Sequence, residues 1–154
     1  AFFESKEEIF LQIYRDAIDR HFNLAINTAE LFAMKTVKEQ FEQLLHSIFD
    51  FQLEDADKIK IFIRILLFPP DPVKEDVKAE FQKMEDKELK LFSTIFQRGI
   101  DSGEIRPGDS IEMATGLICI MDGLFWEMQR YEEAAFRKRM EVVWKQFWDG
   151  VAAT

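Results

Sequence analysis

Ile111–Met128 has the sequence IEMATGLICIMDGLFWEM, which predicts a long helix at the centre of the fold. An ordinary surface helix is apolar along one stripe, whereas this segment is apolar nearly all the way round, as in a helix buried on more than one side. Its three acidic residues argue against a membrane span. Gly116, Cys119 and Gly123 stand three and four positions apart, where another backbone could approach closely. We therefore expect the second face to meet a partner subunit, an enclosed ligand, or both.

The composition limits the function classes open to this chain. It has 154 residues, with Lys+Arg 20, Asp+Glu 29 and a net charge of -9. This length allows one domain, 1–154, with a sizeable core, and the acidic balance opposes binding to nucleic-acid phosphates or to an anionic membrane surface. The one cysteine, Cys119, is predicted to be buried, and a single cysteine fits a reducing cytosol. With no signal-peptide pattern at the start of the sequence, we expect a cytoplasmic location.

Helical periodicity and capping signals predict five further helices, and no stretch shows the alternation of a strand. Ser5 with Glu8, and Thr36 with Glu39, have the spacing of capping boxes at helix starts. The proline pair 69–70 must end the third helix. The predicted helices span about 5–34, 37–53, 54–68, 72–101, 111–128 and 134–150. The sequence therefore predicts an all-α fold, an antiparallel helical bundle of about six helices.

Three segments of this arrangement carry a resemblance to a known family. They are Phe3–Phe10 (FESKEEIF), Gly103–Asp109 (GEIRPGD) and Leu117–Leu124 (LICIMDGL). They resemble three parts of the tetracycline-repressor (TetR) family of bacterial transcription regulators. These parts are the junction after the DNA-binding domain, the turn before the interface helix, and the body of that helix. Because that family's helix-turn-helix lies before the junction, the chain is expected to be a regulatory domain without its DNA-binding domain.

The resemblance implies a function. Members of the family are usually dimeric repressors whose last two helices pair across a two-fold axis to form a four-helix bundle. A small molecule inside each regulatory domain shifts the junction helix and changes the spacing of the two DNA-reading units, so operator DNA is bound only through the N-terminal domain. The residues leave two alternatives open, a ligand-free helical adaptor dimer that binds another protein and, less favoured, an enzyme whose catalytic site is not visible as a motif. A sensor should contain a cavity of a few hundred Å³, whereas an adaptor should be packed solid and expose an apolar patch.

Aromatic and long apolar side chains on several helices predict a cavity for a small apolar or cationic effector. The predicted lining residues are Phe41, Leu45, Phe49, Phe62, Leu66, Phe92, Phe96, Met121, Asp122 and Phe125. Asp122 favours a cation or a hydrogen-bond donor if it points inward; otherwise it bonds to a neighbour or is exposed at a gap. The homodimer interface is predicted on the last two helices. It consists of Gly116, Leu117, Ile120, Leu124, Met140, Val143, Trp144 and Phe147.

The sequence lacks the motifs of common catalytic sites. It contains no Gly-x-Ser-x-Gly, no His-Glu-x-x-His and no glycine-rich phosphate loop. His21 and His46 are isolated and share no metal-like spacing with Cys119. We therefore expect no enzymatic activity, no metal site and no cofactor.

Overall fold

The computed structural model describes residues 5–154 and contains six α-helices and one short 3-10 helix. Phe3, part of the predicted junction segment, lies outside the described residues. The elements are α1 (Lys6–Leu31), α2 (Val37–Leu53), α3 (Ala56–Leu67), η1 (Asp71–Val73), α4 (Lys74–Ser102), α5 (Ser110–Glu127) and α6 (Glu133–Val151). Within the described residues no strand forms beyond an isolated bridge between Ile105 and Ala152. The predicted all-α bundle of six helices is confirmed.

The helix starts follow the predicted capping residues. The Ser5 side chain accepts a hydrogen bond from the backbone N–H of Glu8 at 3.1 Å. Thr36 and Glu39 form a complete capping box, with bonds of 3.2 and 3.1 Å in the two directions. Asp109 accepts bonds from two backbone N–H groups in the first turn of α5. Each cap satisfies donors that a helix start otherwise leaves unpaired, which fixes where α1, α2 and α5 begin.

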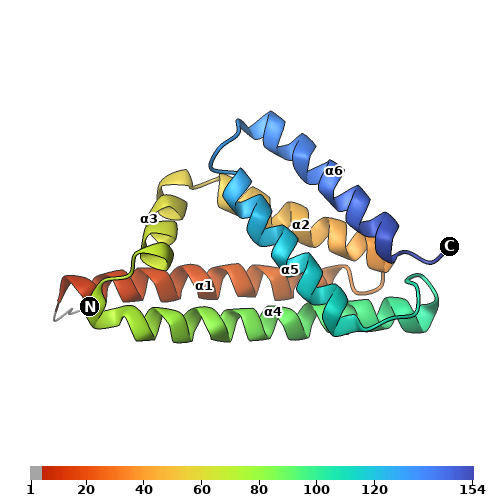
Figure 1. Ribbon diagram of the computed structural model, residues 1–154, viewed down its shortest axis with the longest axis horizontal. Coiled ribbons are helices and arrows are strands. Elements are labelled where there is room, and N and C mark those ends of the chain that lie inside the picture. Colours follow the sequence, from red (N-terminus) through yellow and green to blue (C-terminus); the bar gives the residue numbers. More distant parts are fainter. Residues whose placement is uncertain (1–4) are drawn as a thin grey trace.

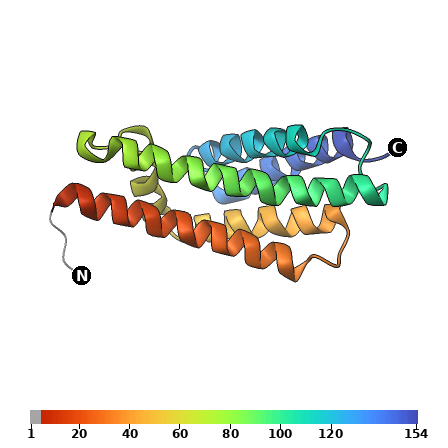
Figure 2. The ribbon, with the colours of Figure 1, turned by 90° about the horizontal axis from the view of Figure 1, so that it is seen from below.

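Helices adjacent in the sequence pack in antiparallel pairs, α1 with α2, α4 with α5, and α5 with α6 (Figure 1). Both views show α1 and α4 side by side and running in the same direction (Figures 1 and 2). The short α3 makes this possible, because it carries the chain from the end of α2 back to the start of α4. The prolines at 69–70 end α3, and α4 begins only after the 3-10 turn of η1 rather than at the predicted Pro72.

Two separate hydrophobic clusters hold the helices together. The larger one joins α2, α4, α5 and α6 with the C-terminal part of α1. The smaller one consists of Leu11, Tyr14, Ile18, Ile65, Val73 and Val77, from the N-terminal half of α1, α3, η1 and the start of α4. Ile65 is the one buried side chain of α3, a helix that the structure describes in full. The inner face of α3 is therefore left facing the space between the two clusters.

The segment Gly103–Asp109 ties three helices together. Gly103 ends α4 in the left-handed region at φ 81°, a conformation that glycine adopts without a steric penalty. The carboxylate of Glu104 accepts bonds from the first two backbone N–H groups of α2, at 2.8 and 3.0 Å. Ile105 is buried, and the Arg106 side chain donates to a backbone carbonyl near the end of α6 at 2.9 Å. The residues of this turn that carry the family resemblance thus have structural roles in this fold.

Candidate functional site

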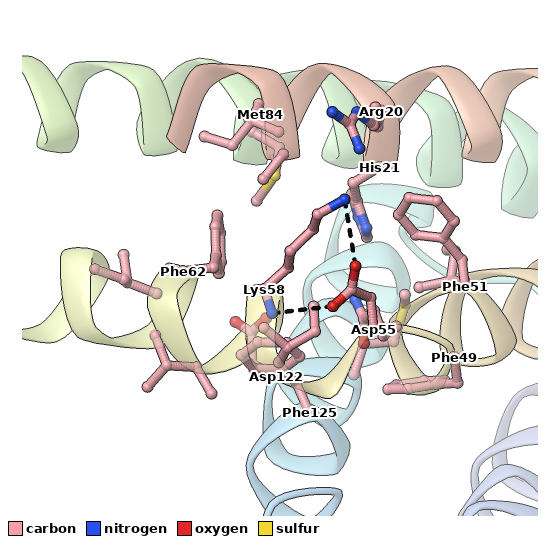
Figure 3. Close-up of a pocket in the computed structure, with 18 of the residues that line it drawn as sticks. Arg20, His21, Phe49, Phe51, Asp55, Lys58, Phe62, Met84, Asp122 and Phe125 are labelled. Carbon is pink, nitrogen blue, oxygen red and sulfur yellow. Dashed lines mark hydrogen bonds and ion pairs between the residues drawn. The ribbon is translucent and has the colours of Figure 1, made fainter. Parts of the chain in front are cut away.

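A cavity of about 540 Å³ lies between the two hydrophobic clusters and is lined by residues of α1, α2, α3, α4 and α5 (Figure 3). Pockets for small molecules span roughly 300–1,000 Å³, so this one is large enough for a drug-sized ligand. The lining residues are Ala17, Ile18, Arg20, His21, Ile48, Phe49, Phe51, Gln52, Glu54, Asp55, Lys58, Ile59, Phe62, Ile63, Leu66, Leu67, Phe81, Met84, Glu88, Met121, Asp122, Phe125 and Trp126.

Helical spacing explains how these side chains reach one cavity. On α3, Phe62 and Leu66 stand four residues apart, so both lie on the face turned toward α1 and α5. On α5, Met121 and Phe125 have the same spacing, and on α1 Ile18 stands three residues before the cavity residue His21. The cavity wall is therefore made from one face of each helix.

An aromatic bridge crosses the apolar side of the cavity. The rings of Tyr14 and Phe62 are stacked, with centroids 5.0 Å apart and an interplanar angle of 7°. Phe62 also meets Phe125 edge-on, with centroids 6.2 Å apart. Burial, reinforced by the carboxylate of Glu80, raises the pKa of the Tyr14 hydroxyl, which has no hydrogen-bond partner among the described residues. Phe62 thus connects α1 to α5 and is itself part of the cavity wall.

Charged and polar side chains gather on another part of the wall. His21 Nε2 contacts Glu88 Oε1, and Glu88 is only 6% exposed. Lys58 Nζ lies 3.2 Å from Asp55 Oδ2, and both residues are labelled in Figure 3. Hydrogen bonds from Lys58 lower the pKa of Asp55, and the nearby charge of Arg20 lowers it further. The cations of this wall therefore face carboxylates of the protein.

Asp122 lines the cavity from α5 and also keeps an exposed surface. Partial burial, together with the charges of Glu88 and Glu85, raises the pKa of its carboxyl from 3.8 to about 6, and His21 opposes this rise. Among the described residues Asp122 makes no hydrogen bond or ion pair. The carboxyl group of Asp122 therefore lies at the cavity and has no bonded neighbour. This excludes the alternative in which it bonds to a neighbouring residue.

Asp122 is expected to make the folded state less stable as the pH rises from about 4 to about 6. A carboxyl whose pKa is higher in the folded than in the unfolded state binds protons more tightly when folded, so its ionisation opposes folding. Asp122→Asn should remove this dependence and stabilise the domain above pH 6 by roughly 1 kcal/mol, a value reduced for solvent screening. Urea unfolding of both proteins from pH 4 to 8 measures the effect, and parallel pH profiles would contradict it.

The structure places the predicted cavity residues in two groups. Those that line the cavity are Phe49, Phe62, Leu66, Met121, Asp122 and Phe125. Phe41, Leu45, Phe92 and Phe96 lie in the larger cluster instead, each no more than 4% exposed. The Phe41 ring lies 4.5 Å from the Phe96 ring and 6.0 Å from the Trp144 ring, between centroids. These four residues do not line the cavity, and rings of α6 pack against two of them, Phe41 and Phe96.

The predicted interface residues lie mostly inside the single chain. Leu117, Leu124, Met140 and Trp144 are 1%, 4%, 2% and 8% exposed. The remaining four, which are partly buried, are Gly116, Ile120, Val143 and Phe147. A side chain buried within its own chain cannot present a surface to a partner, so the first four are corrected to core residues.

A different stripe of α5 faces outward. It contains Ile111, Thr115, Cys119 and Trp126, all exposed. The prediction that Cys119 is buried was therefore wrong. Gly123 lies on the same side and has no atom within 4 Å of the position a Cβ would take. This stripe is narrower than the sequence suggested, because α4 and α6 together cover most of the apolar surface of α5.

The polar cavity residues His21, Gln52 and Glu88 were not predicted, although the sequence carries a signal for two of them. Gln52 stands four residues after Ile48 on the buried stripe of α2, and Glu88 stands four residues after Met84 on the stripe of α4. A polar side chain at a position that the helical period assigns to the interior must find a partner or a polar ligand. That rule would have selected both residues.

Comparison with known proteins supports the fold and leaves the function open. A solved structure described as a protein with unknown function from Rhodococcus sp. RHA1 is similar, with a TM-score of 0.73. The alignment covers 97% of this chain and 75% of that one at 15% sequence identity, so the likeness concerns the fold alone. No family model matches the chain, and no curated protein is similar to it at a significant level.

Within residues 5–154 no helix is both long and apolar enough to cross a membrane. No three His, Cys, Asp or Glu side chains of the range converge in a group that could hold a metal ion.

Proposed function

We propose that this chain is the ligand-sensing and dimerisation domain of a TetR-like transcriptional regulator, a repressor that a small molecule releases from its operator. The observation that carries the proposal is the cavity of about 540 Å³ between two hydrophobic clusters. The cavity opens to the surface at exposed residues such as Phe51, Leu67 and Trp126, and a concave, mostly apolar site of this size is the usual form of a small-molecule site. The partners in this proposal are a second copy of the chain, a small apolar or cationic effector, and operator DNA bound through an N-terminal domain.

The wall of the cavity supports a route from ligand to output. Ala17, Ile18 and His21 belong to α1, the helix that resembles the junction with a DNA-binding domain. The N-terminal half of α1 is held mainly by the smaller cluster, which includes Tyr14 stacked on the cavity residue Phe62. If a ligand binds one arrangement of α1 and α3 more tightly than another, it shifts the population of molecules toward the arrangement that it binds more tightly. A coupling of about 1–3 kcal/mol changes operator affinity roughly 5–150-fold.

The adaptor alternative receives less support from the same structure. An adaptor needs an exposed apolar patch and a solid interior. Leu31 and Met34 near the end of α1 are 78% and 97% exposed, but they belong to a short apolar segment that Glu30 and Lys35 border. The cavity has no role in an adaptor, so the sensor proposal accounts for more of the molecule.

Small aromatic and aliphatic compounds are expected to raise the melting temperature of the chain by binding in the cavity. A native-state ligand at 100 times its Kd stabilises by about 2.7 kcal/mol, which corresponds to roughly 5–10 °C for a domain of this size. Ala17→Trp, which fills part of the cavity from α1, should abolish the shift. Differential scanning fluorimetry across a compound library measures both effects.

The matched control is Ala79→Trp, because Ala79 is exposed on α4 and does not line the cavity. This variant should keep the shift of the wild-type chain. A library that gives no shift with the wild-type chain, or shifts of equal size in Ala17→Trp, would remove the support for sensing and favour the adaptor.

A further inference from the structure

We propose that the cavity selects a protonated amine, or another N–H-bearing organic cation, carried on an aromatic or long apolar body. Gln52 and Asp122 bind the N–H groups of this cation. The inference rests on the proposed sensing function and goes further, because it commits to a charge and to a hydrogen-bonding pattern for the effector.

Gln52 supplies the first argument. Its side chain lines the cavity from α2, the residue is only 9% exposed, and its Oε1 has no hydrogen-bond partner among the described residues. A buried acceptor without a partner costs free energy, and most buried polar atoms in folded proteins are paired. A donor from a bound ligand satisfies this oxygen, so the missing partner indicates a ligand that carries N–H or O–H groups.

The charges of the wall supply the second argument. Asp122 and Glu88 both line the cavity, from α5 and α4, and Glu85 lies close enough to act on Asp122. His21 is the one basic group that faces these acids among the described residues of the wall, and it contacts Glu88 rather than Asp122. Asp122 is thus left without a cation of the protein, and a ligand cation beside it would lower its pKa back toward its ordinary range.

The basic residues of the wall argue against an anionic ligand. Lys58 forms an ion pair with Asp55, and Arg20 is near enough to act on the same carboxylate. A ligand carboxylate or phosphate would have to displace Asp55 from both cations. It would also meet Glu54, Glu88 and Asp122, which line the same cavity.

The apolar part of the cavity determines the body of the ligand. Phe62, Phe81 and Phe125 present aromatic surfaces next to Met84 and Leu66. Such a wall buries a flat or extended apolar body, and aromatic faces also attract a cation that lies over them. The combination fits an aryl-alkyl amine better than a sugar or a nucleotide.

Three probes that differ only in the head group test the inference. They are 6-phenylhexylamine, 6-phenylhexan-1-ol and 6-phenylhexanoate, measured by isothermal titration calorimetry against the wild-type chain at pH 7.5. We expect the amine to bind at least about 10-fold more tightly than the alcohol, because charge-assisted hydrogen bonds are the stronger kind. The carboxylate should bind most weakly.

Two variants assign the preference to the named groups. Gln52→Leu and Asp122→Asn should each reduce the affinity for the amine by about 10-fold and change that for the alcohol by less than about 3-fold. Asp149→Asn, at an exposed carboxylate of α6 outside the cavity, is the charge control and should change neither. Urea unfolding of all three variants verifies that each one folds.

The outcomes separate this inference from the proposed function. Equal affinities for amine and alcohol, both lost in Ala17→Trp, would overturn the cation preference and leave the sensing proposal standing. If 6-phenylhexanoate bound most tightly of the three probes, the cation preference would also be overturned. The head group would then be assigned to Arg20 and Lys58. If none of the three probes binds and the compound library gives no thermal shift, both proposals fail together.

Discussion

Phe96→Ala is expected to lower the free energy of unfolding by about 3–5 kcal/mol, the range for removing a fully buried phenylalanine from a packed core. Phe96 is 0% exposed, and its ring lies 4.5 Å from that of Phe41 and 6.0 Å from that of Phe147, between centroids. The small side chain would leave a void that these rings cannot fill without leaving their own positions. Ligand-dependent thermal shifts should persist in any fraction that remains folded, because Phe96 does not line the cavity.

Phe81→Ala is the matched comparison for Phe96→Ala. Phe81 is half-buried and lines the cavity from the same helix, α4. Its replacement should cost less, about 1–2 kcal/mol, since part of the ring is already exposed and the neighbouring space is already open. It should reduce the ligand-dependent shift. Urea unfolding, combined with scanning fluorimetry at saturating ligand, measures both quantities. If Phe81→Ala lowered the stability more than Phe96→Ala, and Phe96→Ala reduced the ligand-dependent thermal shift more than Phe81→Ala, the assignment of Phe96 to the core and Phe81 to the cavity would be wrong.

This contrast shows what the sequence could predict about the aromatic residues and what it could not. Phe41, Phe49, Phe92 and Phe96 all stand on the inward stripes of α2 and α4, which helical periodicity identifies correctly. Whether such a residue lies in the core or beside the cavity depends on the element that covers it. Rings of α6 pack against Phe41, Phe49 and Phe96 alike, but Phe49 also borders the space that the short α3 leaves open. That difference arises from the packing of helices distant in the sequence, which no local pattern records.

The helix boundaries were more predictable, because they depend on local chemistry. The capping residues Ser5 and Thr36 lie where the sequence predicted them, since a side-chain oxygen within three residues is enough to satisfy the first N–H groups. Glu104 was not predicted to cap α2, because it lies 67 residues from Val37 in the chain. Local caps could be predicted from the sequence, and long-range caps could not.

For α5 the structure confirms burial by more than one helix, and the partner subunit stays a prediction. The nearly continuous apolar surface of α5 was expected to meet a partner subunit, an enclosed ligand, or both, with Leu117 and Leu124 at the subunit interface. In the structure α4 and α6 of the same chain cover these positions. If a partner docks on α5, the surface open to it is the stripe that contains Thr115, Cys119 and Trp126, which is more polar and less extensive.

Arginine substitutions on the two sides of α5 are expected to separate folding from dimerisation. Leu117→Arg should destabilise the domain by more than about 4 kcal/mol, because Leu117 is 1% exposed within the larger hydrophobic cluster, so the charge enters an apolar core. Cys119→Arg should leave the chain folded, since Cys119 is exposed. If the outward stripes pair about a two-fold axis, the new charge meets its own copy or an apolar surface of the partner.

For the dimer, we expect Cys119→Arg to raise the dissociation constant at least about 100-fold, the effect of roughly 3 kcal/mol of desolvation and like-charge repulsion. Analytical ultracentrifugation from 1 to 100 µM measures the equilibrium, and circular dichroism verifies the fold. Ala79→Arg, on the exposed face of α4, is the control for added charge and should sediment like the wild-type chain.

A wild-type chain that is monomeric across this range would refute dimerisation, whereas a dimer unaffected by Cys119→Arg would move the interface away from the centre of the α5 stripe. A dimer that Val142→Arg dissociates instead would place the interface on α6, where Val142 is 54% exposed.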